Sequence, residues 1–325
     1  MHDLKYFLAQ VEGIFANEVF IFEPHELYDP IDYTLRLGGK RIRPTLLLSA
    51  NALFGGDEQQ VRDAALGIET FHNFTLLHDD LMDRSPLRRG QPTVYTKWDD
   101  NTAILSGDTM FALAWRYFLR QPSPRLQEIL QCFNETAIEV CEGQQKDMNF
   151  ERRDDVSLEE YMDMIRQKTA VLLACALKIG ALYAGAPAVD VQRIYDFGIH
   201  LGLAFQIQDD LLDGYGDTAV FGKKTGQDIR DNKKTFLPLK ARQLCDNDQR
   251  KELEQLFVAK DNMDEEEKVR RALTLYNAIG LKKVVEDAIA EEFGTARQIL
   301  DGIHADETLK TPLRELMETL TGRKK

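Results

Sequence analysis

The chain has 325 residues, enough for one large domain or two of ordinary size, and its 43% hydrophobic and 29% charged content is typical of a globular protein. A formal net charge of −13 argues against nucleic acid as the main partner. Its four cysteines form no CxxC pair, which disfavours structural zinc and disulfides and makes the cytoplasm the expected location. We expect no signal peptide and no membrane span, because the most apolar stretch, residues 171–186, is short and contains Lys178.

Apolar residues recur at helical spacing along most of the chain, and no stretch shows a convincing strand alternation or a short repeat. We therefore predict an all-α fold, organised as a single domain over residues 1–325. Residues 1–37 are expected to form one or two helices separated at Pro24. Further helices are predicted over residues 45–54, 101–119 (buried), 125–150, 157–184 and from 236 to the end.

A glycine-rich turn with basic residues precedes the predicted helix over residues 45–54. Gly38 and Gly39 permit a tight turn, and Pro44 fits the first helical position. Backbone N–H groups at this helix start, with Lys40, Arg41 and Arg43 beside them, are typical of an anion site. The alternative is a connecting loop with solvated basic side chains.

An aspartate cluster of the form DDxxD lies near the end of the next predicted helix, which a capping box at Asp57 and Gln60 is expected to open. Asp79 and Asp83 are four residues apart, so they project together, with Asp80 turned to one side. Hard oxygen ligands suit Mg²⁺ and substrate phosphates. The alternative is a solvated acidic helix end.

His72 lies two turns before Asp79 on the same face, which favours a substrate contact over an ordinary core histidine. We interpret His78, which is rotated away from this face, as structural.

A second DDxxD cluster, Asp209, Asp210 and Asp213, begins 130 residues after the first (209 − 79) and also ends a periodic apolar helix, which Gly214 should stop. Two such clusters at the ends of core helices suggest carboxylates that face each other across one cavity. This arrangement predicts a site for several divalent cations and a polyphosphate.

Two further segments carry candidate ligands. Lys168 and Thr169 lie in apolar surroundings, where such a pair by itself is more often a snorkelling lysine and a core threonine. The segment 214–235 is rich in glycine, lysine and aspartate, which indicates a mobile flap over an anionic ligand. It contains no P-loop motif.

Together these motifs resemble those of the trans-isoprenyl diphosphate (polyprenyl) synthases. The matching segments are GGKRIRP at 38–44, HDDLMD at 78–83, RRG at 88–90, KT at 168–169, FQIQDDLLD at 205–213 and FGKK…DNKKT at 221–235. The resemblance implies a class I isoprenoid synthase fold, a helical bundle around a deep central cavity. It also implies a homodimer that uses Mg²⁺.

The resemblance assigns roles to these residues. Asp79, Asp83 and Asp209 should ligate three Mg²⁺ ions on the allylic diphosphate. Asp80, Asp210 and Asp213 should mainly support these ligands rather than bind the ions themselves. The same diphosphate should contact Arg88, Lys168, Lys223 and Lys233, although Lys224 beside Lys223 leaves open which of the two reaches it. Isopentenyl diphosphate should contact Lys40, Arg43, His72 and Arg89. Thr169 and Gln206 should lie along the reacting carbons, and the floor that limits product length should be Phe74, with Thr75 and Phe71.

The function implied is a prenyltransferase that condenses isopentenyl diphosphate with dimethylallyl, geranyl or farnesyl diphosphate, releases pyrophosphate and makes an all-trans C15–C20 product. A medium- or long-chain synthase is the nearest alternative. A class I terpene cyclase would have no use for the second anion site, and a non-catalytic subunit is expected to have lost carboxylates from one cluster. A purely structural or ion-buffering protein leaves the basic residues unexplained.

Overall fold

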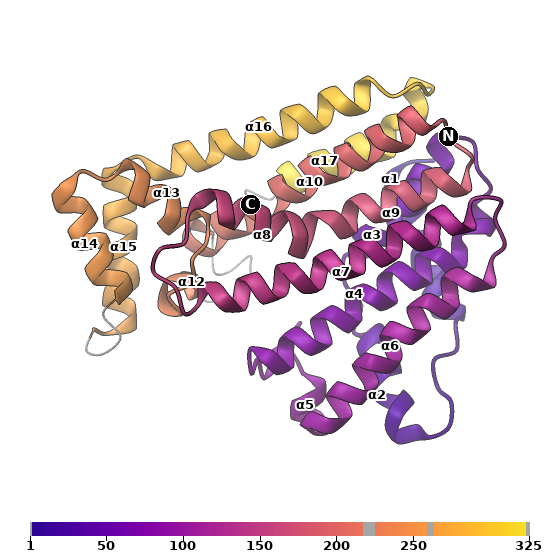
Figure 1. Ribbon diagram of the computed structural model, residues 1–325, viewed down its shortest axis with the longest axis horizontal. Helices are drawn as coiled ribbons and strands as arrows, with labels where there is room; N and C mark the ends of the chain where they lie inside the picture. The colour runs from indigo at the N-terminus through magenta and orange to yellow at the C-terminus, as the bar shows by residue number, and fades with distance from the viewer. Residues whose placement is uncertain (1, 217–224, 259–262, 323–325) are drawn as a thin grey trace. The chain divides into compact units, whose positions relative to one another are not determined.

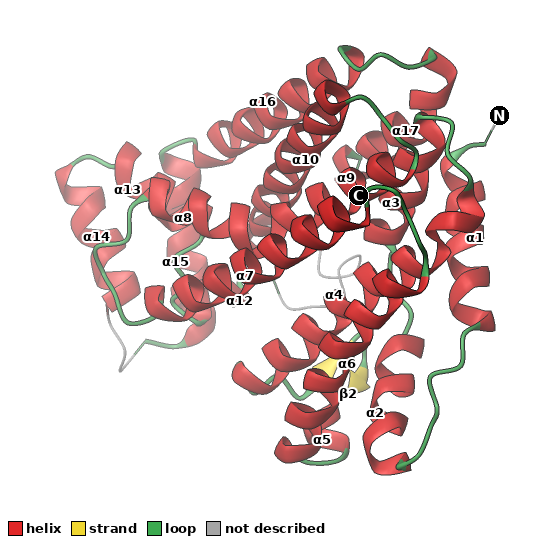
Figure 2. Cartoon of the chain, turned by 45° about the vertical axis from the view of Figure 1, so that its right-hand side comes forward, coloured by secondary structure: helices red, strands yellow, loops and turns green. Residues whose placement is uncertain are grey.

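A computed structural model describes residues 2–216, 225–258 and 263–322 of the chain (Figure 1). Within these ranges nearly all regular structure is helical, which confirms the predicted all-α class (Figure 2). None of the helices in this part of the chain combines the length and apolar composition that crossing a bilayer would need.

The helices are α1 (Leu4–Asn17), α2 (His25–Arg36), α3 (Ile42–Leu53), η1 (Glu58–Val61), α4 (Arg62–Met82), α5 (Val94–Lys97), α6 (Asp100–Arg120), α7 (Leu126–Phe150), α8 (Leu158–Ile165), η2 (Arg166–Ala170), α9 (Val171–Tyr183), α10 (Ala188–Tyr215), α12 (Gln227–Arg230), α13 (Phe236–Leu244), α14 (Asn247–Val258), α15 (Glu265–Ala278), α16 (Leu281–Asp301), η3 (Glu307–Lys310) and α17 (Thr311–Thr321). Strands β1 (Leu87–Arg88) and β2 (Gln91–Pro92) form a short antiparallel hairpin, in which Leu87 pairs with Pro92 and Arg88 with Gln91.

The chain divides into two compact units. Unit 1 comprises Met1–Asn134, Cys175–Ile194 and His304–Glu315, and unit 2 comprises Glu135–Ala174, Tyr195–Ile303 and Leu316–Lys325. The first aspartate cluster belongs to unit 1 and the second to unit 2. The single domain, the central cavity and the facing of the two clusters across it therefore stay predictions.

The core of unit 1 is built around α4, which packs on α3 and α6. Gly67 makes the close approach to α6 possible, because a Cβ at this position would lie 3.1 Å from the carbonyl oxygen of Ala114 and from the ring of Phe118. Phe71 and Phe133 are fully buried in the same core. Burial of each such side chain contributes roughly 1.5–3 kcal/mol, which fixes the α4 end that carries the first cluster.

The core of unit 2 includes α10, the helix that carries the second cluster. Gly202 allows α10 to approach η2, because a Cβ there would lie 2.5 Å from the Cα of Ala170. Ile207 is fully buried and Leu211 nearly so, and both point into this core from the last turns of α10. These contacts hold the end of α10 in place.

Four predicted features are corrected by the structure. Helix α3 begins at Ile42, so Pro44 is its third residue, a position where the missing N–H still removes no intrahelical hydrogen bond. Asp57 caps η1 by accepting a hydrogen bond of 2.9 Å from the N–H of Gln59, and no capping box with Gln60 opens α4. Helix α10 continues through Gly214 to Tyr215.

The fourth correction concerns α6, which was predicted to be buried. It is buried on one side only, because Ile104, Leu105 and Leu119 are 47%, 58% and 57% exposed.

Candidate active site

The first aspartate cluster lies at the C-terminal end of α4, as predicted. Asp79 and Asp80 belong to the last turn, and Asp83 is the C-cap residue, whose N–H donates to the carbonyl of Asp79 at 2.8 Å. Asp80 is buried and accepts a hydrogen bond of 2.7 Å from Nε of Arg88, a residue of β1. Another nitrogen of Arg88 lies 3.8 Å from Asp79. The hairpin thus brings a cation to the inner edge of the cluster, while Asp83 is exposed.

The donor set of this cluster fits Mg²⁺, because carboxylate oxygens are the hard ligands that this ion prefers. Asp79 is half-buried and Asp83 is exposed, whereas Asp80 is buried. No group of three acidic, histidine or cysteine side chains in the described ranges is arranged to hold an ion by itself. Substrate phosphates and water would therefore complete the coordination, as is usual for Mg²⁺.

A basic cluster forms around the turn before α3. A guanidinium nitrogen of Arg43 lies 3.0 Å from Nε2 of His72, which comes from α4. Gly39 has φ +142°, a backbone conformation that favours glycine, and the guanidinium of Arg89 lies close by, 2.6 Å from where a Cβ of residue 39 would be. Lys40 follows at the exposed edge of the turn. The predicted residues Arg43, His72 and Arg89 are therefore brought together in unit 1.

Burial lowers the pKa of two side chains in this basic cluster, His72 and Arg43. Burial, followed by the charge of Arg43, holds the pKa of His72 well below its ordinary value, so the imidazole is neutral near pH 7. Its Nε2 then accepts the hydrogen bond from Arg43. Burial lowers the pKa of Arg43 to about 10, and this side chain stays protonated at neutral pH.

Arg41, which was predicted to flank the anion site, has a structural role instead. It is 4% exposed, donates to a carboxylate oxygen of Glu69 at 3.1 Å and donates to the carbonyl of Leu35 at 2.5 Å. Its guanidinium also lies 4.2 Å from the ring centroid of Phe15. Arg41 has a left-handed backbone (φ +46°) at the N-cap of α3, and its buried guanidinium is already bonded to Glu69 and Leu35.

The second aspartate cluster lies in the last two turns of α10. Asp209 is exposed, whereas Asp210 is 5% exposed and accepts three hydrogen bonds. Its donors are the hydroxyl of Tyr161, the backbone N–H of Phe236 at 3.0 Å and Nε2 of Gln206 at 3.2 Å. Burial raises the pKa of Asp210 to about 7, although these donors lower it. Sequence reasoning did not identify Tyr161.

Asp213, the third member of the second cluster, is bonded to a residue of the segment 214–235, which was predicted to be a flap. One of its carboxylate oxygens accepts a hydrogen bond of 3.0 Å from the N–H of Asp228. Burial, followed by the charge of Asp213, raises the pKa of Asp228 to about 8. Lys233 donates its backbone N–H to the carbonyl of Asp228 at 2.9 Å. Lys233 thus lies beside the second cluster, whereas Lys223 and Lys224 fall outside the described residues.

Lys168 belongs to a π-helical turn, η2, and not to the continuous helix that was predicted over 157–184. Ser157 and Glu160 form a capping box at the start of α8, which confirms the predicted start of this helix, so only the continuity of the predicted helix was wrong. Single π turns of this kind occur often at functional sites.

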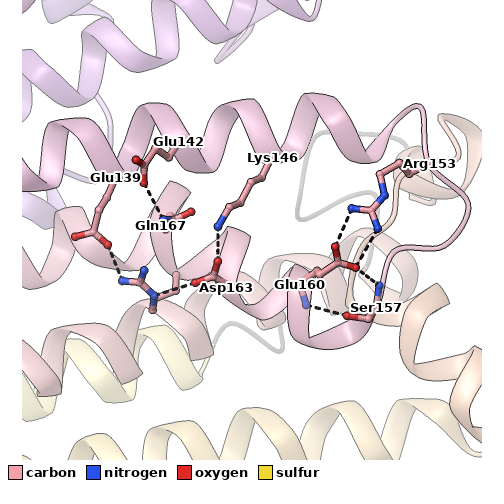
Figure 3. A network of polar contacts seen from close by, with 9 residues as sticks. Glu139, Glu142, Lys146, Arg153, Ser157, Glu160, Asp163 and Gln167 are labelled. Carbon is pink, nitrogen blue, oxygen red and sulfur yellow. Dashed lines mark hydrogen bonds and ion pairs between the residues drawn. The ribbon is translucent and has the colours of Figure 1, made fainter.

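Three successive residues of η2 each bond to an acidic residue of α7. Arg166 donates to Glu139 at 2.7 Å, Gln167 to Glu142 at 3.1 Å and Lys168 to Asp147 at 2.6 Å. Figure 3 shows the contact of Gln167 with Glu142, together with the pairing of Lys146 and Asp163 and that of Arg153 and Glu160. Gly143 of α7 permits this approach, because a Cβ there would clash with the backbone nitrogen of Lys168. Lys168 is therefore held by a partner rather than snorkelling.

Thr169 and Gln206, both predicted to lie along the reacting carbons, contact each other. The hydroxyl of Thr169 donates to Oε1 of Gln206 at 3.1 Å, and Nε2 of Gln206 donates to Asp210. Thr169 and the second cluster are thus joined in one hydrogen-bonded chain within unit 2.

The predicted floor residues form an aromatic cluster in unit 1. The ring centroids of Phe74 and Phe71 lie 5.5 Å apart, and the hydroxyl of Thr75 donates to the carbonyl of His72 at 2.8 Å. Phe111 of α6 stacks on Phe74 at 5.4 Å and lies 5.6 Å from Phe71. Sequence reasoning did not identify Phe111, although it lies on a predicted helix.

His78 packs its ring 4.9 Å from that of Phe74, and its Nε2 lies 3.2 Å from the carbonyl of Ile104. These packing contacts agree with the interpretation of His78 as structural.

Comparisons with known proteins agree with the motifs. The profile of the family described as polyprenyl synthetase matches residues 24–276. A geranylfarnesyl diphosphate synthase of Natronomonas pharaonis is 42% identical over 70% of this chain and 72% of its own. A short chain isoprenyl diphosphate synthase of Methanothermobacter thermautotrophicus is 36% identical over 86% and 85% of the two chains. A crystal structure of a geranylgeranyl pyrophosphate synthase, 43% identical, superposes with a TM-score of 0.95 over 100% of both chains.

Proposed function

We infer that the chain, which belongs to the polyprenyl synthetase family, is a prenyltransferase that condenses isopentenyl diphosphate with an allylic diphosphate to a short-chain prenyl diphosphate. The observation that carries this function is that unit 1 contains an acidic cluster and, separate from it, a basic cluster. Arg88 contacts the carboxylates of Asp79 and Asp80, whereas Arg43 contacts the neutral His72. Two sites of opposite charge suit two different diphosphates, one bound through metal and the other directly.

The basic cluster is proposed to bind isopentenyl diphosphate through Lys40, Arg43, His72 and Arg89. A cation whose nearest partner is a neutral imidazole keeps its charge available to an anion. A terpene cyclase ionises a single diphosphate and would not need this second site. The cluster therefore favours a synthase over a cyclase.

The two aspartate clusters are proposed to bind Mg²⁺, which members of this family generally use. We propose three ions, with Asp79, Asp83 and Asp209 as ligands. When bound, Mg²⁺ would neutralise the charge that develops on the departing diphosphate. Burial of Asp80 and Asp210, each held by hydrogen bonds, supports their assignment as residues that orient the neighbouring ligands.

The cationic side chains of the proposed allylic site are Arg88, Lys168 and Lys233, with Lys223 or Lys224. They would hold the allylic diphosphate as its C–O bond breaks, which stabilises the leaving group. The allylic carbon then bonds to the double bond of isopentenyl diphosphate. The oxygens of Thr169 and Gln206 would face the positive charge, and the departed pyrophosphate would accept the proton whose loss restores the double bond. The predicted flap over residues 214–235, of which 217–224 lie outside the described residues, is proposed to exclude water.

We propose a homodimer located in the cytoplasm. The exposed apolar side chains of Ile104, Leu105 and Leu119 on α6 support a surface that a second copy covers. Sedimentation of the purified protein tests the proposed dimer. A dimer that Leu105→Lys dissociates would support it, and a wild-type monomer would contradict it.

The proposed reaction is tested by incubating purified protein with Mg²⁺, labelled isopentenyl diphosphate and each of dimethylallyl, geranyl and farnesyl diphosphate. Chromatography of the products should show an all-trans C15 or C20 diphosphate that requires an allylic primer. Cyclised hydrocarbon formed without isopentenyl diphosphate would instead identify a terpene cyclase. No product with any primer would indicate a non-catalytic subunit.

A further inference from the structure

The hydroxyl of Tyr161 makes a buried contact with the carboxylate beside the proposed metal ligand Asp209. Tyr161 lies on α8, is 2% exposed and donates to one oxygen of Asp210. The N–H of Phe236, the first residue of α13, donates to the same oxygen at 3.0 Å. Nε2 of Gln206, one turn earlier on α10, donates to the other oxygen at 3.2 Å. One carboxylate therefore joins α8, α10 and α13 in the core of unit 2.

The position of Asp210 controls the direction of its neighbour. Consecutive residues of an α-helix project about 100° apart, so the inward Asp210 leaves Asp209 directed outward, where it is exposed. The contacts to α8 and α13 prevent the last turns of α10 from rotating about their axis. The orientation of Asp209 thus depends on donors that do not themselves reach the surface.

We propose, resting on the function proposed above, that Tyr161 is a positioning residue that sets the direction in which Asp209 meets a Mg²⁺-diphosphate. Tyr161 touches neither substrate nor metal. It acts through Asp210, as donors behind a ligating carboxylate commonly do. α8 also leads directly into the π turn that carries Lys168, so one helix supports two proposed diphosphate contacts.

Tyr276 supplies a matched comparison within unit 2. Its side chain is also fully buried, and its hydroxyl has no hydrogen-bond partner among the described residues. Replacing either tyrosine with phenylalanine removes one oxygen atom from the core. Only the change at Tyr161 removes a donor from Asp210, so the pair separates positioning from packing.

The experiment compares wild type, Tyr161→Phe and Tyr276→Phe as full-length proteins. Calorimetry measures binding of inorganic pyrophosphate in the presence of Mg²⁺, and steady-state kinetics measures the Mg²⁺ activation constant and KM for each substrate. Tyr161→Phe should weaken Mg²⁺-pyrophosphate binding and raise the Mg²⁺ activation constant about 10-fold, because one of the hydrogen bonds that hold Asp210 in place is lost. The KM for isopentenyl diphosphate should stay within about 2-fold of wild type. Tyr276→Phe should leave all these values unchanged.

Wild-type Mg²⁺-pyrophosphate binding by a folded Tyr161→Phe protein would overturn the proposal, and so would equal losses in both tyrosine variants. Should Tyr161→Phe fail to fold, Asp210→Asn disturbs the same contact from its other side and should weaken Mg²⁺-pyrophosphate binding similarly. A wild type that binds Mg²⁺-pyrophosphate but transfers no prenyl group would contradict the proposed function alone. In that case a specific loss of binding in Tyr161→Phe would still support the positioning role.

Discussion

Arg43 places a guanidinium nitrogen 3.0 Å from Nε2 of His72, so the basic cluster of unit 1 contains a histidine that accepts a hydrogen bond from an arginine. Burial and the positive charge of Arg43 hold the pKa of His72 well below its ordinary value. Protonation of His72 would remove this acceptor and place two cations side by side. The neutral imidazole is therefore a condition for the cluster, and it has a measurable thermodynamic consequence.

The stability that the neutral His72 contributes should fall as the pH is lowered through about 6.5, the pKa of histidine in an unfolded chain. Asp210 and Asp228, whose pKa values burial raises to about 7 and about 8, act with the opposite sign in the same range, so the His72 contribution is measured as the difference between wild type and a His72 variant. In the folded chain the pKa of His72 is lower than in the unfolded chain. As the pH falls, the unfolded state therefore binds the proton first and becomes more stable relative to the folded state. The stability that the neutral His72 gives to the folded state is fully present above about pH 6.5 and is lost below it. Urea unfolding between about pH 8 and pH 5.5 measures the slope. His72→Gln should lose less stability than wild type as the pH is lowered from about 8 to 5.5, because it removes the group whose protonation favours unfolding. His25→Gln, a change at an exposed histidine, should leave the slope as in wild type. Equal slopes for wild type and His72→Gln would contradict this assignment.

The two diphosphate sites should respond to different substitutions. Arg43→Ala or Arg89→Ala should raise the KM for isopentenyl diphosphate about 10- to 100-fold, because each removes a charge-assisted hydrogen bond, with a smaller effect on the allylic primer. Lys168→Ala, in unit 2, should do the reverse. Arg62→Ala changes an exposed arginine at the start of α4 and serves as the control, with both KM values near wild type. Identical effects of the three test changes on both substrates would show that the partition is wrong.

Removal of one proposed metal ligand should reduce turnover far more than stability. Asp209 is exposed, so Asp209→Ala should leave the unfolding midpoint close to that of wild type. Turnover should fall roughly 10²–10³-fold, the usual loss for one electrostatic stabiliser of developing charge. EDTA should abolish activity and added Mg²⁺ restore it. Asp248→Ala, at a side chain that is 96% exposed, is the control. Turnover of Asp209→Ala within a few-fold of that control would refute the ligand role.

Local features of the site could be predicted from the sequence, because helical spacing alone decides them. Asp79 and Asp83 are four residues apart at a helix end, and the structure has them there. Arg41 and Arg43 look equivalent in the sequence, yet only Arg43 joins the basic cluster. The partner of Arg41 is Glu69, 28 residues away on another helix, and no local pattern identifies it.

The features that sequence reasoning missed depend on contacts between distant segments. Tyr161 donates to a carboxylate 49 residues away. The π turn is held by Gln167 and its partner Glu142, 25 residues earlier, and its backbone needs the space left by Gly143. Such geometry follows from how helices pack, which propensity and periodicity do not specify.

The last prediction concerns product length, which the aromatic cluster of unit 1 should control. We propose that the growing prenyl tail extends from the first aspartate cluster along α4 toward Phe74, five residues before Asp79. Phe111 stacks on Phe74 from α6, and Phe71 is fully buried behind both rings. A tail that meets these rings would stop at 15 or 20 carbons, and the cluster disfavours a medium- or long-chain product.

Phe74→Ala should open space beyond the proposed floor and shift products upward by one or more five-carbon units, while ionisation of the allylic primer stays near normal. Phe111→Ala should cause a similar shift, because it removes the ring that supports Phe74. Phe118→Ala is the matched control: its ring is fully buried and packs 4.6 Å from Phe133, outside the contacts of Phe74. It should cost roughly 3–5 kcal/mol of stability without changing the products. Product chromatography and urea unfolding of all three variants decide the matter. A Phe74→Ala protein that loses stability like Phe118→Ala and keeps the wild-type product would show that Phe74 only fills the core.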